Sequence, residues 1–236
     1  MRMSLFRKLW RMRWVLRSIF STLYFNFHYL PFKQAIRLPI LLYKPKLLKC
    51  KGCVKICKPG VKFGMIRLGT YRVSIYPNSG IIWENDGTIE FHGHCSIGKN
   101  SSLSIGANGV VTFGDMFSAT TTLRLVCYNR ISFEERVCIG WECSFMDTDF
   151  HRMKKLDGGY TKGFGSIQIG KGCWFANRCT ILKNTQTAEY NTFSTGSIVS
   201  KKFNIPYAVY GPSNIELKRE GIYIDIEDDK INYESF

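Results

Sequence analysis

The feature that most constrains this chain is a six-residue repeat between Ile167 and Lys202. Every sixth position is mostly bulky and apolar, and the position four residues later is small. The bulky series is Ile169, Phe175, Ile181, Thr187, Phe193 and Val199, and the small series is Cys173, Cys179, Thr185, Asn191 and Ser197. A period of six fits neither an α-helix at 3.6 nor an ordinary strand at 2. It fits a chain that turns a corner every six residues, so the pattern predicts triangular coils stacked into a β-helix, with the bulky residues inside.

The repeat recurs upstream with less regular spacing. Its bulky positions there are Phe91, Ile97, Ile105, Phe113, Phe133, Ile139 and Phe145, and imperfect repeats extend back over residues 66–89. We therefore predict an all-β chain, with a β-helix of parallel strands over residues 61–205. The repeat breaks once, after Phe145, which predicts a loop insertion at residues 152–166. Residues 1–60 are then an N-terminal arm, and residues 206–236 are a strand or short helix that caps the last coil, followed by an acidic tail.

The net charge of +15 is an N-terminal property, because residues 1–83 contain 17 Lys or Arg and no Asp or Glu. The remaining 16 basic residues and all 18 acidic ones lie in residues 84–236. The basic strip at residues 49–62 has no base-reading motif beside it. It therefore favours anionic lipid or a phosphorylated carrier as partner, and no nucleic acid is expected.

The nine cysteines predict neither a disulfide framework nor a metal site. Their number is odd, no secretory signal is recognisable, and four of them occupy small positions of the repeat: Cys95, Cys143, Cys173 and Cys179. There cysteine acts as a small hydrophobe in a reducing compartment. Cys50, Cys53 and Cys57 form C-x2-C-x3-C, but a zinc site usually needs a fourth nearby ligand and none is obvious. We expect incidental thiols and no metal.

Residues 2–24 are expected to form a basic amphipathic helix. One face collects apolar residues at helical spacing: Leu5, Leu9, Met12, Leu16, Ile19, Phe20 and Leu23. Trp10 and Trp14 lie beside arginines and lysines, which is typical of a helix lying in a membrane interface. The alternative is that the helix packs on the solenoid or on a sister subunit, and both interpretations stay open. Residues 24–48, with three prolines, are expected to be extended and docked.

The most polar cluster of the chain falls at the break in the repeat. Asp147, Asp149 and His151 alternate, so in an extended chain their side chains point the same way. A histidine titrates near neutral pH and a nearby carboxylate can orient it, which suits a general base. The alternative is that the two aspartates cap a turn and His151 hydrogen-bonds the loop. His92 and His94 are expected to be solvated corner residues.

Three stretches together resemble the hexapeptide-repeat acyltransferases, in particular the branch that acetylates sugars of bacterial surface polysaccharides. They are MDTDFH at Met146–His151, IQIGKGCWFANRCTIL at Ile167–Leu182 and GSIVSKKFNIPYAVYGP at Gly196–Pro212. The resemblance covers roughly two thirds of the chain. It implies a left-handed parallel β-helix, and a homotrimer with active sites between subunits.

The resemblance also implies a mechanism and a set of residues. His151 would take the proton of an acceptor hydroxyl as that oxygen attacks the thioester of acetyl-CoA, and backbone N–H groups would stabilise the oxyanion. Asp147 or Asp149 would assist His151. The residues implied for CoA binding are Trp174, Ala176, Asn177, Ser200, Lys201, Lys202 and Arg219. The chain departs from the family at Lys183-Asn184, where a Pro-Gly turn is usual, and at residues 211–215.

These observations favour an acetyl-CoA-dependent O-acetyltransferase acting on a saccharide, nucleotide-linked or lipid-linked, in the cytoplasm at the inner membrane face. Three other functions stay open. The acceptor could be an amino sugar or serine, with N-acetylation on the same fold. A zinc carbonic anhydrase would need three of the four histidines, His28, His92, His94 and His151, to meet at a subunit interface. A β-helix that only assembles would bind no CoA.

Overall fold

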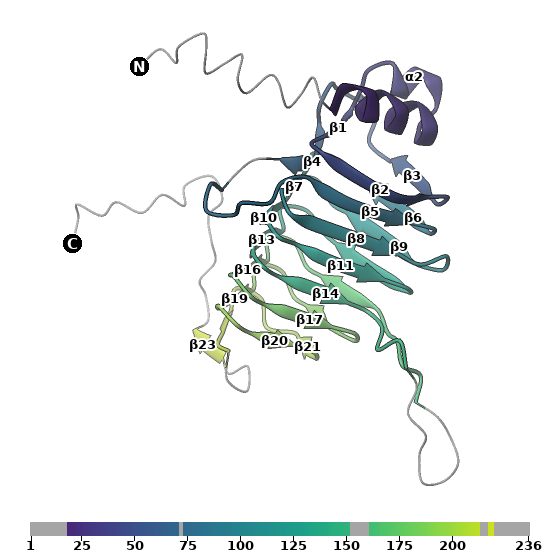
Figure 1. Ribbon diagram of the computed structural model, residues 1–236. Helices are drawn as coiled ribbons and strands as arrows, with labels where there is room; N and C mark the ends of the chain where they lie inside the picture. The colour runs from purple at the N-terminus through teal and green to yellow at the C-terminus, as the bar shows by residue number, and fades with distance from the viewer. Residues whose placement is uncertain (1–17, 71–72, 152–160, 213–216, 220–236) are drawn as a thin grey trace, which may run out of the picture.

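Three parallel sheets form the sides of a triangular prism (Figure 1). The computed structural model describes residues 18–70, 73–151, 161–212 and 217–219, the last as backbone. Sheet A contains β1 (Ile40–Leu42), β4 (Ile66–Thr70), β7 (Cys95–Gly98), β10 (Phe117–Thr121), β13 (Cys138–Trp141), β16 (Trp174–Phe175), β19 (Thr192–Phe193), β22 (Val209–Tyr210) and β23 (Leu217–Arg219).

The other two sheets have seven strands each. Sheet B contains β2 (Pro45–Cys50), β5 (Ile81–Asn85), β8 (Ser101–Ile105), β11 (Arg124–Cys127), β14 (Ser144–Met146), β17 (Thr180–Leu182) and β20 (Ile198–Val199). Sheet C contains β3 (Cys53–Ile56), β6 (Thr88–Phe91), β9 (Val110–Phe113), β12 (Arg130–Phe133), β15 (Ile167–Ile169), β18 (Gln186–Thr187) and β21 (Lys202–Phe203). The chain visits A, B and C in turn, so each circuit is one coil of a left-handed parallel β-helix.

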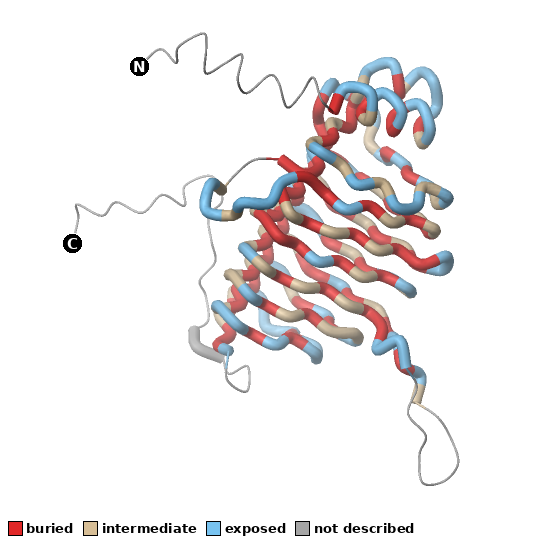
Figure 2. Tube along the Cα trace, viewed as in Figure 1, coloured by how far each residue is buried: buried red, intermediate tan, exposed pale blue. Residues whose placement is uncertain are grey.

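The predicted repeat positions line the interior of the prism (Figure 2). All six bulky positions between Ile169 and Val199 are buried, and so are the five small ones. Aromatic rings stack from coil to coil, as in Phe91, Phe113 and Phe133, whose successive ring centroids lie 5.4 and 5.5 Å apart. The four cysteines at small positions are buried as predicted, and all nine cysteines are free thiols. The repeat therefore sets the core.

The prism begins earlier than the sequence indicated. β1, β2 and β3 pair in register with β4, β5 and β6, so residues 40–56 form the first coil inside the stretch expected as an arm. The buried positions are present there, as Ile40, Leu42, Val54 and Ile56. Their spacing is irregular and lysines interrupt them, which hid the coil from a six-residue template.

Left-handed backbone conformations let the chain turn between sheets A and B. Asn100, Thr122, Glu142 and Arg178 occupy equivalent corners of successive coils with φ between 55° and 59°. Gly98 lies at the end of its strand, where an added Cβ would come within 1.7 Å of the Thr120 carbonyl oxygen. Glycine is required at this position because the adjacent coils approach too closely for a Cβ atom.

Helices and a returning strand close the two ends of the prism. Residues 18–29 are helical and α2 (Phe32–Ala35) follows, so the expectation of an extended segment from residue 24 is wrong at this point. The first part of the expected helix, residues 2–17, lies outside the described residues. At the other end, β23 pairs antiparallel with β22, in line with the expected capping strand. No described helix is long and apolar enough to cross a membrane.

Candidate active site

The insertion leaves the prism at the corner between sheets B and C, which we call the B–C corner. The other connections from sheet B to sheet C are two to four residues long, whereas β14 and β15 are separated by the 20 residues 147–166. Both described stems of the insertion run outward from this corner (Figure 1). Thr148 and Phe164 form an antiparallel bridge that joins the stems.

Asp147 anchors the insertion to the coil above it. Its side chain is fully buried, and its carboxylate accepts hydrogen bonds from the backbone N–H groups of Tyr128 and Asn129, both at 2.8 Å. Cys127 Sγ donates to the same carboxylate at 3.3 Å, and burial followed by the charge of Asp147 raises the pKa of this thiol. These hydrogen bonds occupy the carboxylate and stabilise the corner, which agrees with the alternative in which Asp147 caps a turn.

Asp149 and His151 lie on the exposed side of the same stem. The Asp149 carboxylate pairs with Lys183 Nζ, which comes from the next coil, and its backbone N–H donates to the Gly163 carbonyl at 2.7 Å. His151 is exposed and has no hydrogen-bond partner among the described residues. Of the two aspartates, Asp149 alone remains accessible beside the histidine.

An aromatic pair stands next to this stem. The rings of Tyr128 and Phe150 meet edge to face with centroids 4.9 Å apart, and both side chains are partly exposed. Phe150 adopts a left-handed conformation with φ of 58°, and its N–H donates to Thr148 Oγ1 at 3.0 Å. This turn directs the chain into His151. The sequence alone assigns no part in the site to Tyr128, Phe150 or Lys183, because their contacts depend on the stacking of coils.

The residues expected to bind CoA are divided between two corners. Trp174 lies on β16 of sheet A, and Ala176 and Asn177 follow it at the corner between sheets A and B, the A–B corner. Asn177 Oδ1 accepts a hydrogen bond from Thr195 Oγ1 at 2.6 Å. From Asn177 the chain crosses sheet B through β17 before it reaches the B–C corner, roughly 20 Å away at the rise of an extended chain. One chain does not bring these residues to His151.

Three of the four remaining CoA-binding candidates lie at the same corner as the histidine. Ser200 and Lys201 turn the B–C corner two coils beyond the insertion, and Lys202 begins β21; all three are exposed. Arg219 lies on β23, and its side chain is outside the described part of the structure. The B–C corner thus stacks Asp149, Lys183 and Lys201 on three successive coils.

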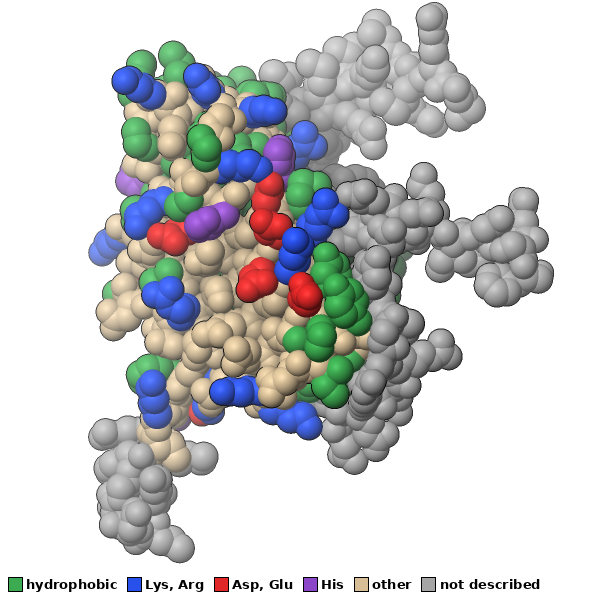
Figure 3. All heavy atoms as spheres, turned by 180° about the vertical axis from the view of Figure 1, so that it is seen from behind, with side chains coloured by type: hydrophobic (Ala, Val, Ile, Leu, Met, Phe, Trp, Pro, Cys, Tyr) green, Lys and Arg blue, Asp and Glu red, His purple; other side chains and the backbone are tan. Residues whose placement is uncertain are grey.

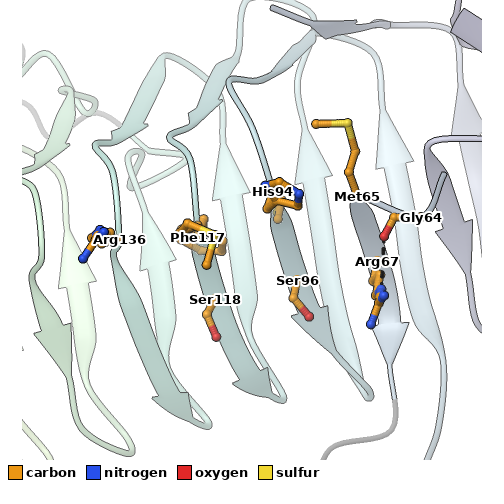
Figure 4. A pocket seen from close by; sticks show the side chains of 10 residues that line it. Gly64, Met65, Arg67, His94, Ser96, Phe117, Ser118 and Arg136 are labelled. Atoms are coloured by element: carbon orange, nitrogen blue, oxygen red, sulfur yellow. Dashed lines mark hydrogen bonds between the residues drawn. The ribbon is translucent and has the colours of Figure 1, made fainter. Parts of the chain in front are cut away.

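The two hollows described on the surface flank another corner, between sheets C and A, the C–A corner. One has a volume of about 390 Å³ and is lined by Arg67, His94, Ser96, Ser118 and Arg136 among others, from successive coils (Figure 4). The other, about 510 Å³, includes His92, Asp115 and Lys171. Neither contains a residue of the predicted site.

The histidines are spread over the molecule. His92 and His94 are exposed at the C–A corner as predicted, His28 lies on the N-terminal helix, and His151 lies at the B–C corner. In the described part of the chain, one group could hold a metal: Cys57, Glu90 and His92, whose ligand atoms lie within 4.8 Å of one another. It contains a single histidine, and Glu90 is already paired with Lys55 at 3.2 Å. One chain therefore assembles no three-histidine zinc site from its described residues.

Comparison with solved structures finds acetyltransferases among the proteins that resemble this chain. The polysialic-acid-specific acetyltransferase NeuO matches with a TM-score of 0.52 at 15% identity, over 80% of this chain and 82% of that one. The polysialic acid O-acetyltransferase OatWY matches with a TM-score of 0.39 at 17% identity, over 81% and 90%. A hexapeptide-repeat acetyltransferase from Vibrio cholerae O1 biovar eltor, complexed with acetyl coenzyme A, matches with a TM-score of 0.33 at 13% identity, over 89% and 87%. No protein-family model and no curated protein matches the sequence. The likeness to NeuO confirms the predicted left-handed β-helix.

Proposed function

We propose that this protein is an acetyl-CoA-dependent O-acetyltransferase that modifies a saccharide hydroxyl. The observation that carries the proposal is the B–C corner, where the longest insertion between strands leaves the coils and presents His151 from a stem fixed by Asp147. A stacked prism gains nothing from such a break, and loops on rigid scaffolds carry function disproportionately. The fold shared with NeuO, whose name gives polysialic acid as its substrate, supports a saccharide acceptor.

In the proposed reaction, His151 accepts the proton of the acceptor hydroxyl as that oxygen attacks the thioester carbonyl. The tetrahedral intermediate collapses with cleavage of the carbon–sulfur bond, and the CoA thiolate takes the proton from the imidazolium. The acetyl group passes directly to the sugar. Asp149 is the accessible carboxylate of this stem, and we assign it the role of favouring the imidazolium; its partner in the structure is Lys183.

The division of the candidate residues supports a site shared between subunits. In a homotrimer, the A–B corner of one subunit, with Trp174 and Asn177, would face the B–C corner of its neighbour, with His151. Lys201 and Lys202 are exposed cations that suit the phosphates of CoA. We place this trimer in the cytoplasm, at the inner membrane face through residues 2–24, where the acceptor is nucleotide-linked or lipid-linked.

The test is transfer of labelled acetyl groups from acetyl-CoA to a panel of nucleotide-linked and lipid-linked saccharides. We expect label on at least one saccharide in alkali-labile ester linkage. Alkali-stable label would indicate N-acetylation. Absence of transfer together with absence of CoA binding would overturn the proposal, and stoichiometric zinc in the purified protein would favour a metalloenzyme.

A further inference from the structure

The inner face of the N-terminal helix attaches to the prism through a polar stripe, beside the buried ring of Phe25, which packs on Trp83. Ser18 Oγ and Thr22 Oγ1 accept hydrogen bonds from the N–H groups of Lys44 and Leu42, at 2.9 and 3.1 Å. Asn26 accepts from the Ile40 N–H at 3.1 Å and donates to the Ile40 carbonyl at 2.7 Å. These hydrogen bonds pair backbone N–H and C=O groups along the outer edge of β1, the first strand of sheet A. Without the helix these groups would have no partner in the sheet.

The opposite stripe of the helix is apolar and faces solvent (Figure 2). Phe20, Leu23, Tyr24 and Phe27 follow the i, i+3, i+4, i+7 spacing of one helix face, and Phe20 is 79% exposed. Phe32 continues the surface, with its ring centroid 6.0 Å from that of Phe27. We call the whole set the outer apolar stripe: Ile19, Phe20, Leu23, Tyr24, Phe27, Phe32 and Ile36.

This surface is unusual for the molecule as a whole. Its seven residues lie within an 18-residue stretch, yet they make up seven of the 18 large hydrophobic side chains exposed in the described structure. Soluble proteins rarely leave large aromatic side chains gathered in one exposed patch without a partner. Because the polar stripe already attaches the helix, the outer apolar stripe is available for another contact.

The charges around the stripe are of one sign. Residues 18–70 contain 10 Lys or Arg and no Asp or Glu. Three of the lysines pair with acidic residues of the coils below, and within the described residues five other cations form no ion pair: Lys33, Arg37, Lys46, Lys51 and Lys62. The end of the prism that carries the helices shows basic and hydrophobic side chains together (Figure 3).

We propose that the outer apolar stripe is the face by which this protein docks on an anionic lipid bilayer. Aromatic and aliphatic side chains would enter the boundary between headgroups and acyl chains, while Lys33 and Arg37 meet lipid phosphates. A second copy of the chain is a poorer occupant, because it would bring the same cations against these. This docking face is fixed to the prism, and it places the membrane contact proposed above for residues 2–24 on the described residues 19–36.

Docking by this face sets the height of the B–C corner above the membrane. The insertion leaves the fifth coil, four coil spacings from β1, and adjacent strands lie about 4.8 Å apart, which places the corner roughly 20 Å from the first coil. The prism axis would point away from the bilayer. Docking by this face does not depend on the acyl-transfer reaction.

The test is co-sedimentation of the full chain with vesicles of phosphatidylcholine and phosphatidylserine, against vesicles of phosphatidylcholine alone. We expect binding to the anionic vesicles that weakens with added salt and persists in part. The double substitution Phe20→Ser and Phe27→Ser should lower vesicle affinity at least roughly tenfold, because two exposed rings lose apolar burial. The matched control, Ile198→Ser with Ile205→Ser, removes exposed apolar side chains at the far end of the prism and should bind as the wild type does.

Three results would overturn the docking face. The full chain could ignore anionic vesicles, or the Phe20 and Phe27 double variant could bind as tightly as wild type. Alternatively, the double variant could sediment with a lower mass than wild type, which would make the stripe a contact between copies. Acetyl transfer to a soluble saccharide is measured on the same proteins. Its loss in all of them, wild type included, would refute the proposed function and leave the vesicle result standing.

Discussion

Two corners of the same prism are built from similar residues and serve different ends. At the C–A corner side-chain contacts link the coils. Asp115 pairs with Lys58, two coils away, and accepts a hydrogen bond from the His94 N–H, one coil away, at 2.7 Å. Further along, the rings of Tyr190 and Tyr207 stack 5.0 Å apart. At the B–C corner the short connections are interrupted once by the 20-residue insertion 147–166, and contacts between coils continue beyond it, as in the pair of Asp149 with Lys183.

The difference shows how a periodic scaffold can acquire a site. A carboxylate at the C–A corner is used for holding coils together, and Asp147 does the same where the insertion begins. Because Asp147 fixes the stem, the residues just beyond it are exposed but still keep a defined position. The B–C corner therefore offers Asp149 and His151 on a stem that leaves the coils, whereas His92 and His94 stay on the short connection between β6 and β7.

The largest effect is expected from removing the histidine of the B–C corner. His151→Ala should lower acetyl transfer by about 10²–10⁴-fold, the usual contribution of a general base. Steady-state rates and CoA binding measure this, and CoA affinity should change little. His92→Ala, at the C–A corner, is the matched control and should retain the wild-type rate. Equal rates in the two variants would return His151 to a structural role.

A second prediction separates the two aspartates. Asp147→Asn should lower the free energy of unfolding by about 1.5–3 kcal/mol. The buried carboxylate accepts two backbone N–H bonds, and a neutral amide in its place would accept them less strongly. Asp149→Asn, whose side chain is exposed, should leave stability unchanged and shift the pH dependence of transfer. Denaturant unfolding and a pH–rate profile measure the two effects. If Asp149→Asn proves the more destabilising change, the assignments must be exchanged.

The smallest expected effect concerns acid stability at the C–A corner. Partial burial alone would raise the pKa of Asp115, but hydrogen bonds from Lys58 and His94 outweigh it and lower the pKa from 3.8 to about 2. Since the folded pKa lies below the unfolded one, the stabilisation is complete above pH 3.8 and is lost as the pH falls towards 2. The loss should be about 1–2 kcal/mol after allowance for solvent screening.

Unfolding of wild type and Asp115→Asn across this pH range measures that loss. The variant should be less stable than wild type near neutral pH, and the gap should close in acid. A gap of constant size would mean that the ion pair with Lys58 is not the source of the stabilisation.

The sequence predicted the coils of the prism wherever successive strands kept the six-residue spacing. The buried series from Ile169 to Val199 follows directly from that spacing. The first coil, residues 40–56, could not be found this way, because its register depends on pairing with residues 66–91. The N-terminal helix was predicted, but its attachment by Ser18, Thr22 and Asn26 was not, since an apolar stripe ordinarily marks the buried face.

For the candidate site, the local sequence located the break in the repeat and the polar cluster. It did not show which of the two aspartates is buried and which is accessible. The pattern of Asp147, Asp149 and His151 left the orienting carboxylate undecided. In the structure the Asp147 carboxylate accepts hydrogen bonds from the N–H groups of Tyr128 and Asn129, which lie one coil away and about twenty positions earlier. The separation of Trp174 from His151 likewise follows from coil geometry, which no short motif records.

The central claim is that the B–C corner carries the chemistry and is completed by the A–B corner of another subunit. It is tested most directly by mixing two inactive proteins, His151→Ala and the double variant Trp174→Ala with Asn177→Ala, under conditions in which subunits exchange. In a trimer with random assortment, about a quarter of the interfaces would combine an intact His151 with an intact Trp174 and Asn177. We expect recovery of about a quarter of wild-type transfer. No recovery, in a mixture whose subunits are shown to exchange, would contradict a site shared between the two corners.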